Sequence, residues 1–310
     1  MDVRIFCEMA FKGLDYDSFT DRHVSPGAIG RKLGLDEKTV RVRVKKMEDE
    51  GFIKYYQVVP NLALFGLQSI CSYRFEAINI MTKRRVVEHI QQIPHVMEAA
   101  DYLGHAVSVN IAGNSSKEAQ TVADSIAKRF ELTTIDLGGR PIRKPISKPD
   151  KLDWQIILKL RYDALCGTKD LAQALSITPR MAEYRITKLF GSGSLLIRAI
   201  LDTQKQEGLL FYELEVTVEE TKQFAVVKLL SEMYGEKLWS MRTTSEGGVL
   251  LANFFGFTLA EPEEAVVTTL EIEGVRACSV LIFKEAIEPQ SPNWLDKFIE
   301  EKIMTSSKSG

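Results

Sequence analysis

Residues 38–60, KTVRVRVKKMEDEGFIKYYQVVP, align without a gap with residues 180–202, RMAEYRITKLFGSGSLLIRAILD. Each stretch carries three apolar residues at i, i+4 and i+7 spacing, which is one face of a helix. These are Val40, Val44 and Met47 in the first stretch, and Ala182, Ile186 and Leu189 in the second, followed by Gly51 and Gly193 respectively. An internal repeat decides architecture, so the alignment predicts two copies of one structural unit.

The composition is that of an ordinary globular protein. The chain has 310 residues, of which 45% are hydrophobic and 26% charged, with a net charge of −2. This length predicts two domains or more. No apolar run is long enough to span a bilayer, and the first residues do not resemble a secretory signal. The cysteines are far apart in apolar patterns, as expected for core residues of a cytoplasmic protein: Cys7, Cys71, Cys166 and Cys278.

Residues 1–66 predict a winged helix-turn-helix domain. Two short helices, Pro26–Leu33 and Glu37–Glu50, are separated by a Gly-Leu-Asp turn whose aspartate can cap the second helix. The segment 52–60 is rich in β-branched and aromatic residues and predicts a strand. Two helices with a tight turn followed by a β-ribbon are the elements of a winged DNA-binding domain.

The second of these helices carries cations on the face opposite its apolar stripe. Lys38, Arg41 and Lys45 recur at helical spacing. Cations near a helix N-terminus oppose the macrodipole, so helix stability does not explain them, whereas contacts to phosphates and base edges do. The predicted DNA-contacting residues of the first copy are Lys38, Thr39, Arg41, Val42, Arg43, Lys45, Lys46 and, on the wing, Lys54.

The rest of the chain predicts a second domain type and then a repeat of both. Residues 67–139 have the order βαββαβ of a ferredoxin-like domain. The prediction is therefore an α+β protein with two copies of a winged helix-turn-helix followed by a ferredoxin-like domain. The remaining segments are a basic, proline-rich linker at 140–151, a second winged domain at 152–204, a second ferredoxin-like domain at 205–288 and a tail at 289–310.

The second copy of the DNA-reading helix has a different charge pattern. Glu183 stands where the first copy has Arg41, and Thr187 stands where it has Lys45. Each lost cation removes a phosphate contact, so the second copy is expected to bind DNA differently or more weakly. Its candidate contacts are Arg180, Tyr184, Arg185 and Lys188, although Arg185 could equally form a structural ion pair.

Motifs for metals, cofactors or catalysis are not visible in the sequence. The histidines are scattered, and the sequence around Gly191-Ser192-Gly193 lacks the third glycine of a dinucleotide loop. No Walker loop, nucleophile elbow or close acid pair is visible. We therefore expect no metal and no cofactor, and a protein that is not an enzyme.

The stretch LGLDEKTVRVRVKKMEDEGFIK with the following VPN resembles the Lrp/AsnC (feast/famine) family of transcription regulators. The resemblance implies a sequence-specific regulator that binds double-stranded DNA and has no membrane partner. It also implies pairing of the ferredoxin-like sheets, as an intrachain pseudo-dimer, a homodimer or both. Many members bind an amino acid or similar effector near a hairpin turn, which here corresponds to Tyr102, Gly104 and His105. The residues after Gly104 supply no carboxylate where the family pattern has one.

Two alternatives stay open at this point. Siroheme decarboxylases are similar in build and have lost DNA binding, and they would need clustered His, Arg and Tyr side chains to hold tetrapyrrole carboxylates. The strands offer Arg74, Tyr102, His105, Tyr212 and Arg242 for that purpose. An assembly or sensor protein with vestigial winged domains is the other alternative. The retained basic helix of the first copy favours the regulator.

Overall fold

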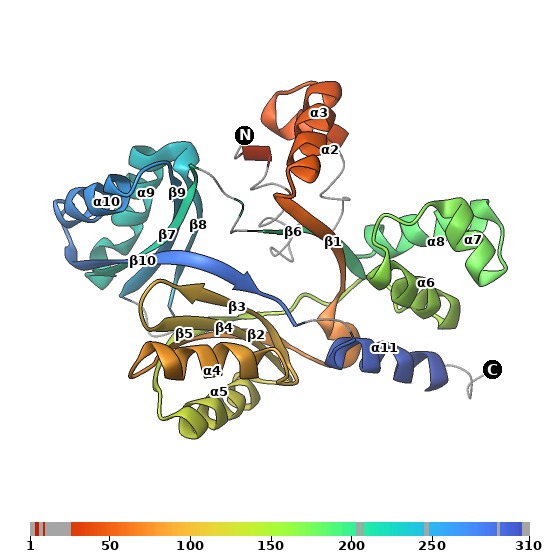
Figure 1. Ribbon diagram of the computed structural model, residues 1–310, viewed down its shortest axis with the longest axis horizontal. Helices are drawn as coiled ribbons and strands as arrows, with labels where there is room; N and C mark the ends of the chain where they lie inside the picture. Colours follow the sequence, from red (N-terminus) through yellow and green to blue (C-terminus); the bar gives the residue numbers. More distant parts are fainter. Residues whose placement is uncertain are drawn as a thin grey trace. The chain divides into compact units, whose positions relative to one another are not determined.

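The chain forms two compact units, each built from segments that are distant in sequence (Figure 1). Unit 1 comprises Met1–Gln68, Ile142–Asp202 and Gln290–Gly310, and unit 2 comprises Ser69–Pro141 and Thr203–Pro289. The computed structural model describes residues 4–5, 9, 26–202, 205, 208–244, 248–289 and 292–305. The predicted first helix, over residues 2–11, lies mostly outside the described residues.

Unit 1 opens with a helix-turn-helix whose bounds follow the sequence pattern. Helix α2 (Pro26–Leu33) is followed by α3 (Glu37–Asp49) and then by strand β1 (Ile53–Pro60) and a short 3-10 helix, η3 (Leu62–Phe65). Asp36 caps α3 as predicted, because its carboxylate accepts a hydrogen bond from the Thr39 backbone N–H at 2.8 Å. A Cβ at Gly30 would lie 2.6 Å from the Leu35 carbonyl oxygen, so the two helices approach closely there.

The second part of unit 1 also ends in a helix pair and a strand. Helices α6 (Lys151–Tyr162), α7 (Thr168–Leu175) and α8 (Pro179–Gly191) precede strand β6 (Leu195–Leu201). Thr178 caps α8 through its hydroxyl, whereas Gly167 stands at the start of α7 and caps it without a side-chain bond.

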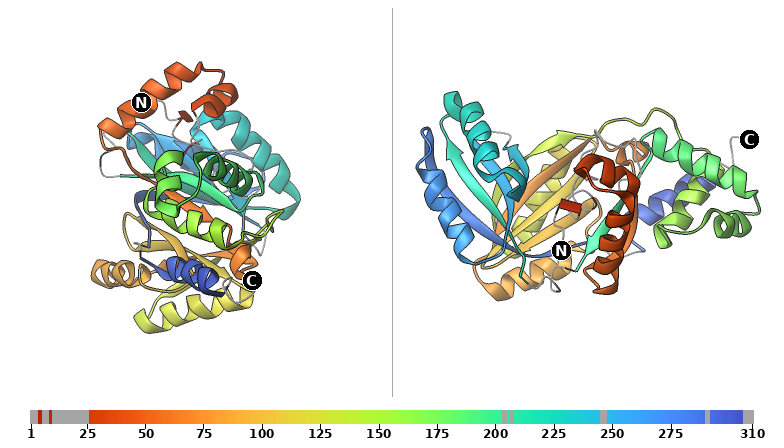
Figure 2. Two further views of the ribbon diagram at one scale, coloured as in Figure 1. Left: turned by 90° about the vertical axis from the view of Figure 1, so that its right-hand side faces the viewer. Right: turned by 90° about the horizontal axis from the view of Figure 1, so that it is seen from above.

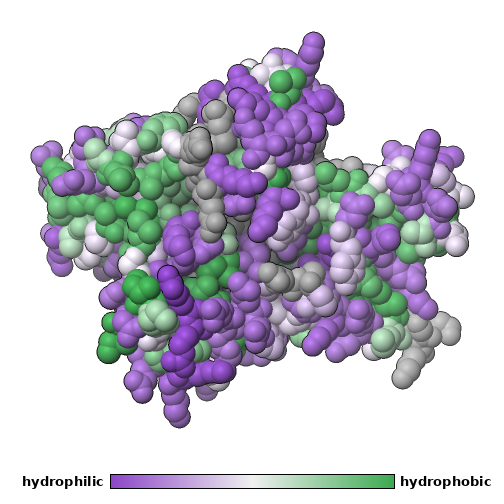
Figure 3. All heavy atoms as spheres, viewed as in Figure 1, coloured by the Kyte–Doolittle hydropathy of each residue, from purple (hydrophilic) through white to green (hydrophobic). Residues whose placement is uncertain are grey.

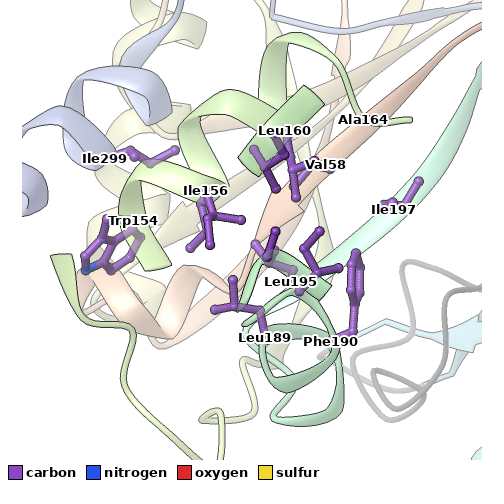
Figure 4. Packing of buried hydrophobic residues seen from close by; sticks show 14 of the residues in the cluster. Val58, Trp154, Ile156, Leu160, Ala164, Leu189, Phe190, Leu195, Ile197 and Ile299 are labelled. Atoms are coloured by element: carbon purple, nitrogen blue, oxygen red, sulfur yellow. The ribbon is translucent and has the colours of Figure 1, made fainter. Parts of the chain in front are cut away.

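Strands β1 and β6 pair antiparallel with each other and join the two parts of unit 1. Figure 4 shows a hydrophobic core packed around this junction. Its members come from β1, from α6 to α8, from β6 and from the C-terminal helix, and include Val58, Trp154, Ile156, Leu189, Phe190, Ile197 and Ile299.

The C-terminal segment, predicted only as a tail, contains a 12-residue helix, α11 (Trp294–Thr305). Ile299 is fully buried, and Asp296 forms a buried ion pair with Arg161 of α6. Arg161 also donates a hydrogen bond to the Val58 carbonyl oxygen at 3.1 Å. Local sequence did not reveal this helix because its stability depends on partners that are far away in sequence.

Unit 2 is an eight-stranded antiparallel sheet with helices on one face of each half (Figures 1 and 2). The strands run in the order β5-β2-β4-β3-β10-β7-β9-β8. The first half consists of β2 (Ser69–Glu76), α4 (Ile80–Ile90), β3 (Val96–Tyr102), β4 (Ala106–Gly113), α5 (Ser116–Phe130) and β5 (Thr133–Pro141). The second half consists of β7 (Leu210–Val218), α9 (Gln223–Tyr234), β8 (Leu238–Thr243), β9 (Val249–Gly256), α10 (Ala260–Leu270) and β10 (Val275–Ile287).

The alternation of side chains separates two faces of this sheet. Tyr73 and Phe75 of β2 pack into a core beneath α4 and α5, and Leu214 and Val216 of β7 pack into a core with residues of α9 and α10. Residues between these positions, such as Arg74, therefore point to the opposite face, which we call the inner face. The mixed α+β class predicted from the sequence is confirmed.

Candidate functional site

Helix α3 exposes its cations and buries its apolar stripe. Val40, Val44 and Met47 are buried against the rest of the domain. The side chains of Arg41 and Lys45 are 65% and 67% exposed. The predicted contacts Lys38, Arg43 and Lys46 are exposed as well. Figure 3 shows mostly hydrophilic residues over α2 and α3. The helix therefore presents a cation-bearing surface to solvent.

Several of these cations are balanced within the helix itself. Arg41 pairs with Glu37, the Lys45 Nζ lies 2.6 Å from an Asp49 carboxylate oxygen, and the Lys46 Nζ lies 3.6 Å from one of Glu50. The hydrogen bond to Asp49 raises the pKa of Lys45. Exposed ion pairs one helical turn apart contribute little to stability, so a phosphate can replace the carboxylate at low cost.

The remaining predicted residues of the first copy have different surroundings. Val42 is 62% exposed between the cations of α3. Lys54 is exposed at the start of β1. Thr39 is half-buried, and its hydroxyl bonds to Asp36, so it serves the helix cap. The neighbouring Tyr56 is directed away from solvent, and its hydroxyl donates to Glu48 at 2.7 Å.

In the corresponding helix of the second part, α8, some of the predicted DNA contacts are exposed to solvent and others are bonded to neighbouring residues. Arg180 and Tyr184 are exposed, as is Glu183. Arg185 instead donates from Nη1 to Asp150 and to Asp153, the latter at 2.9 Å. The Lys188 Nζ lies 3.5 Å from the same Asp153, which is fully buried.

These acids form the N-terminal cap of α6. Asp150 and Asp153 make a reciprocal capping box, in which each side chain accepts from the other's backbone N–H. Hydrogen bonds to Asp150 and Asp153 raise the pKa of Arg185. Partial burial alone would raise the pKa of Asp150, but the bond from Arg185 and the backbone bond from Asp153 bring it below its usual value. Arg185 therefore has a structural partner, as the sequence analysis had left open.

The three residues predicted to hold an effector differ in their exposure to solvent. Tyr102 is buried at the end of β3, whereas Gly104 and His105 are exposed in the turn that follows. Gly104 has a φ of +83°, which accounts for the glycine. The buried ammonium of Lys83 holds this turn, because it donates to the carbonyl oxygens of Tyr102 and Gly104 and pairs with Asp101 at 2.6 Å.

The inner face of the sheet in unit 2 gathers charged residues, of which Arg74 and Arg242 were named from the sequence and Glu213 and Glu215 were not. Arg74 of β2 is 4% exposed, and it forms an ion pair with Glu215 of β7. The Arg74 Nη1 lies 3.8 Å from Glu213, which is also buried. Arg242 of β8 donates to the Ser72 hydroxyl at 2.7 Å. Glu213 and Glu215 alternate with apolar residues in LFYELEVTV, which is the signal that would have revealed them.

The inner-face cluster contains groups with shifted pKa values and, as far as the structure describes the chain, polar atoms that lack hydrogen bonds. Burial raises the pKa of Glu213 above its ordinary value of 4.5, although Arg242 and Arg74 act in the opposite direction. Two nitrogens of Arg74, Nε and Nη1, and one oxygen of Glu213 have no hydrogen-bond partner among the described residues. Burial, with the nearby Glu213 charge, also raises the pKa of Tyr102. A perturbed, incompletely bonded group of this kind is a candidate functional site as well as a structural one.

Of the five residues named above for a tetrapyrrole site, only three lie close together. Arg74, Arg242 and Tyr102 meet in this cluster, where the charges of both arginines act on Tyr102. Tyr212 lies on the other face and stacks on Phe254, and His105 is exposed. Within the described ranges, no group of three or more His, Cys, Asp or Glu side chains could hold a metal ion. No helix in the described part of the chain is long and apolar enough to cross a membrane.

Comparisons with known proteins support a DNA-binding domain at the N-terminus. Residues 20–54 match a family model described as winged helix-turn-helix DNA-binding. Uncharacterised HTH-type transcriptional regulators of Pyrococcus abyssi and Pyrococcus horikoshii are each 32% identical over 72 residues, which are 23% of this chain. The aligned segment spans about half the length of these relatives, 48% of each.

Among solved structures, the siroheme decarboxylase NirDL matches nearly the whole chain. The match covers 98% of this chain and 99% of that one, with a TM-score of 0.55 and 12% identity. The same enzyme in co-complex with an iron-uroporphyrin III analogue matches with a TM-score of 0.54 over 92% of this chain and 93% of that one, at 12% identity. At this identity the likeness establishes a shared fold. Escherichia coli AsnC covers 47% of this chain with a TM-score of 0.36.

The expectation that the protein is not an enzyme is overturned by the match to NirDL, because an enzyme is built on the same scaffold along almost its entire length. The expectation rested on the lack of a linear catalytic motif. A linear motif is not required, because residues that meet from separate strands, such as those of β2, β7 and β8 on the inner face, leave no compact signature in the sequence.

Proposed function

We propose that the protein is a transcription regulator that binds duplex DNA through α3 of its first winged domain. The observation that carries the proposal is the exposed cationic face of α3 on a segment that matches a DNA-binding winged helix-turn-helix. In such domains the second helix enters the major groove. Lys38, Arg41 and Lys45 would meet phosphates or base edges, and Val42 could contact a thymine methyl group.

The second helix pair would take a lesser part in this function. Arg180 and Tyr184 are exposed and remain candidate contacts, whereas Arg185 is occupied by the α6 cap. Glu183 would face phosphates unfavourably. We expect Glu183→Ala to leave DNA affinity unchanged or to raise it. In this proposal the two parts form a pseudo-dimer within one chain, in which only the first winged domain reads DNA strongly.

The proposal is tested by fluorescence anisotropy with a labelled genomic duplex across a salt titration. We expect the double variant Arg41→Ala/Lys45→Ala to lower affinity roughly 10–100-fold near 0.1 M salt and to reduce the salt slope by about two, since two phosphate contacts are lost. The matched control is Lys117→Ala/Lys228→Ala, which removes the same charge from exposed positions on helices of unit 2. Equal binding curves for both double variants would show that α3 is not the reading helix.

A second candidate function is a tetrapyrrole-converting enzyme on the same scaffold. It is supported by the whole-chain likeness to siroheme decarboxylase NirDL, by the buried Arg74 and Tyr102, and by the exposed Arg242 on the same face. Arginine is suited to hold the carboxylates of such a substrate. A ferric uroporphyrin added to the purified protein should then produce a saturable shift in the visible spectrum that Arg74→Gln weakens. A spectrum that is the sum of the free components excludes this candidate.

A further inference from the structure

Arg74 and Glu215 occupy matching places in the two halves of unit 2. Both halves have the same strand order, β5-β2-β4-β3 in the first and β10-β7-β9-β8 in the second. In the first half Ser69 of β2 lies opposite Gly113, and in the second half Leu210 of β7 lies opposite Gly256. Arg74 and Glu215 are each the fifth residue after these anchoring positions. One half therefore has a cation where the other has a carboxylate.

These matching residues also touch each other. Arg74 Nη2 donates a hydrogen bond to Glu215 Oε2. Strands β2 and β7 are four places apart in the sheet, which is about 19 Å in a flat sheet, so the sheet must fold over and bring its inner faces together. A residue that contacts its own counterpart lies near the twofold axis that relates two copies. The Arg74–Glu215 pair therefore marks an approximate twofold axis inside unit 2.

We infer that the charges at this axis allow a first half to pair only with a second half. Two first halves joined through the same face would place Arg74 against Arg74. Two second halves would place Glu215 against Glu215, with Glu213 adding further negative charge. Arg74 is 4% exposed, so solvent would screen such like charges poorly. The inner face of the first half is complementary in charge to a face that carries Glu213 and Glu215. The same charges disfavour its pairing with a second copy of the first half.

Beside the axis, a carboxylate in one half likewise stands where the other half has a hydroxyl. In the first half the Asn110 side chain joins Ser72 of β2 to Glu98 of β3. In the second half Asn253, which pairs with Glu213 of β7, donates to Ser240 of β8 at 3.1 Å. In the first half the hydroxyl is on β2 and the carboxylate is on β3. In the second half the carboxylate is on β7 and the hydroxyl is on β8. The two inner faces are thus complementary to each other and not to themselves.

Charge reversals in the full-length chain test this inference independently of DNA binding. Arg74→Gln removes the attraction, whereas Arg74→Glu also reproduces the rejected pairing of like charges. We expect Arg74→Glu to melt roughly 5 °C or more below Arg74→Gln, because an unpaired or like-charged buried carboxylate costs several kcal/mol. Glu215→Arg should likewise melt at a lower temperature than Glu215→Gln.

The double reversal Arg74→Glu/Glu215→Arg restores opposite charges and is expected to melt above either single reversal. This comparison still decides the question if a single reversal fails to fold. Light scattering should give the mass of one chain for the wild type and for the double reversal. Two results would overturn the inference. One is equal melting of Arg74→Glu and Arg74→Gln, and the other is a double reversal that is no more stable than the single ones.

Discussion

At the scale of single residues, an arginine that recurs in two aligned stretches of sequence need not have the same function in both. Arg43 and Arg185 align in the sequence, and both were predicted to contact DNA. The structure shows Arg185 bonded to Asp150 and Asp153 at the start of α6, with its side chain only 19% exposed. A pattern of cations along a helix cannot reveal such a partner, because the acids belong to another element.

Arg185→Ala should therefore affect stability more than DNA binding. The change leaves the fully buried Asp153 with Lys188 as its remaining cation, so we expect the free energy of unfolding to fall by about 2 kcal/mol. Urea denaturation measures this loss. Arg180→Ala on the same helix is the control, since Arg180 is exposed. Equal stability of the two variants would contradict the structural role of Arg185.

Glu213 should give unfolding a distinct pH dependence. Burial raises its pKa in the folded state, so the folded protein holds this proton more tightly than the unfolded chain does. The stabilisation it provides is present below the unfolded pKa and is lost as the pH rises through the folded pKa. The groups that face it are Arg74, Arg242, Glu215 and Asn253. The free energy of unfolding of the wild type should thus decline relative to Glu213→Gln as the pH rises above about 4.5.

Chemical denaturation of wild type and Glu213→Gln at several pH values measures this difference. Gln cannot ionise, so it mimics the protonated carboxyl group across the whole range. A constant difference between the two proteins over pH 4–8 would show that Glu213 has the same pKa in both states.

At the scale of elements, the helices of unit 1 were largely predictable and the C-terminal helix was not. The bounds of α2 and the caps of α3 and α8 follow from local chemistry, such as the carboxylate of Asp36 and the hydroxyl of Thr178. Helix α11 depends on Arg161 of α6 and on the core around Trp154, which are long-range partners. Arg74 and Arg242 were named from the sequence, but their meeting with Glu213 and Glu215 was not predicted, because strand order decides which strands meet.

Asp296→Ala should destabilise unit 1 by about 3–5 kcal/mol, because it leaves Arg161 buried without its carboxylate. Asp296 also accepts from the Asn293 backbone N–H at 2.8 Å, so the start of α11 loses a cap as well. The melting temperature measures the effect, with Lys297→Ala, an exposed neighbour on the same helix, as the control. If both variants melt like the wild type, α11 contributes little to unit 1.

At the scale of the whole molecule, the two aligned stretches of sequence share their apolar positions and differ in their charges. Shared positions such as Val44 and Ile186 are buried and build the fold. The divergent positions are exposed on α3 and α8, as with Arg41 and Glu183, or lie at the axis of unit 2, as with Arg74 and Glu215. The divergence accounts for two properties in our proposals, namely DNA reading by one winged domain and pairing of unlike halves in the sheet.

The most direct test of this account is the selection of genomic DNA fragments by the purified full-length protein, followed by determination of the enriched motif. We predict an asymmetric motif in which one half-site is strongly constrained, and this half-site should lose its enrichment in the Arg41→Ala/Lys45→Ala variant. A palindrome with two equally constrained half-sites, or no enrichment over input DNA, would contradict the account.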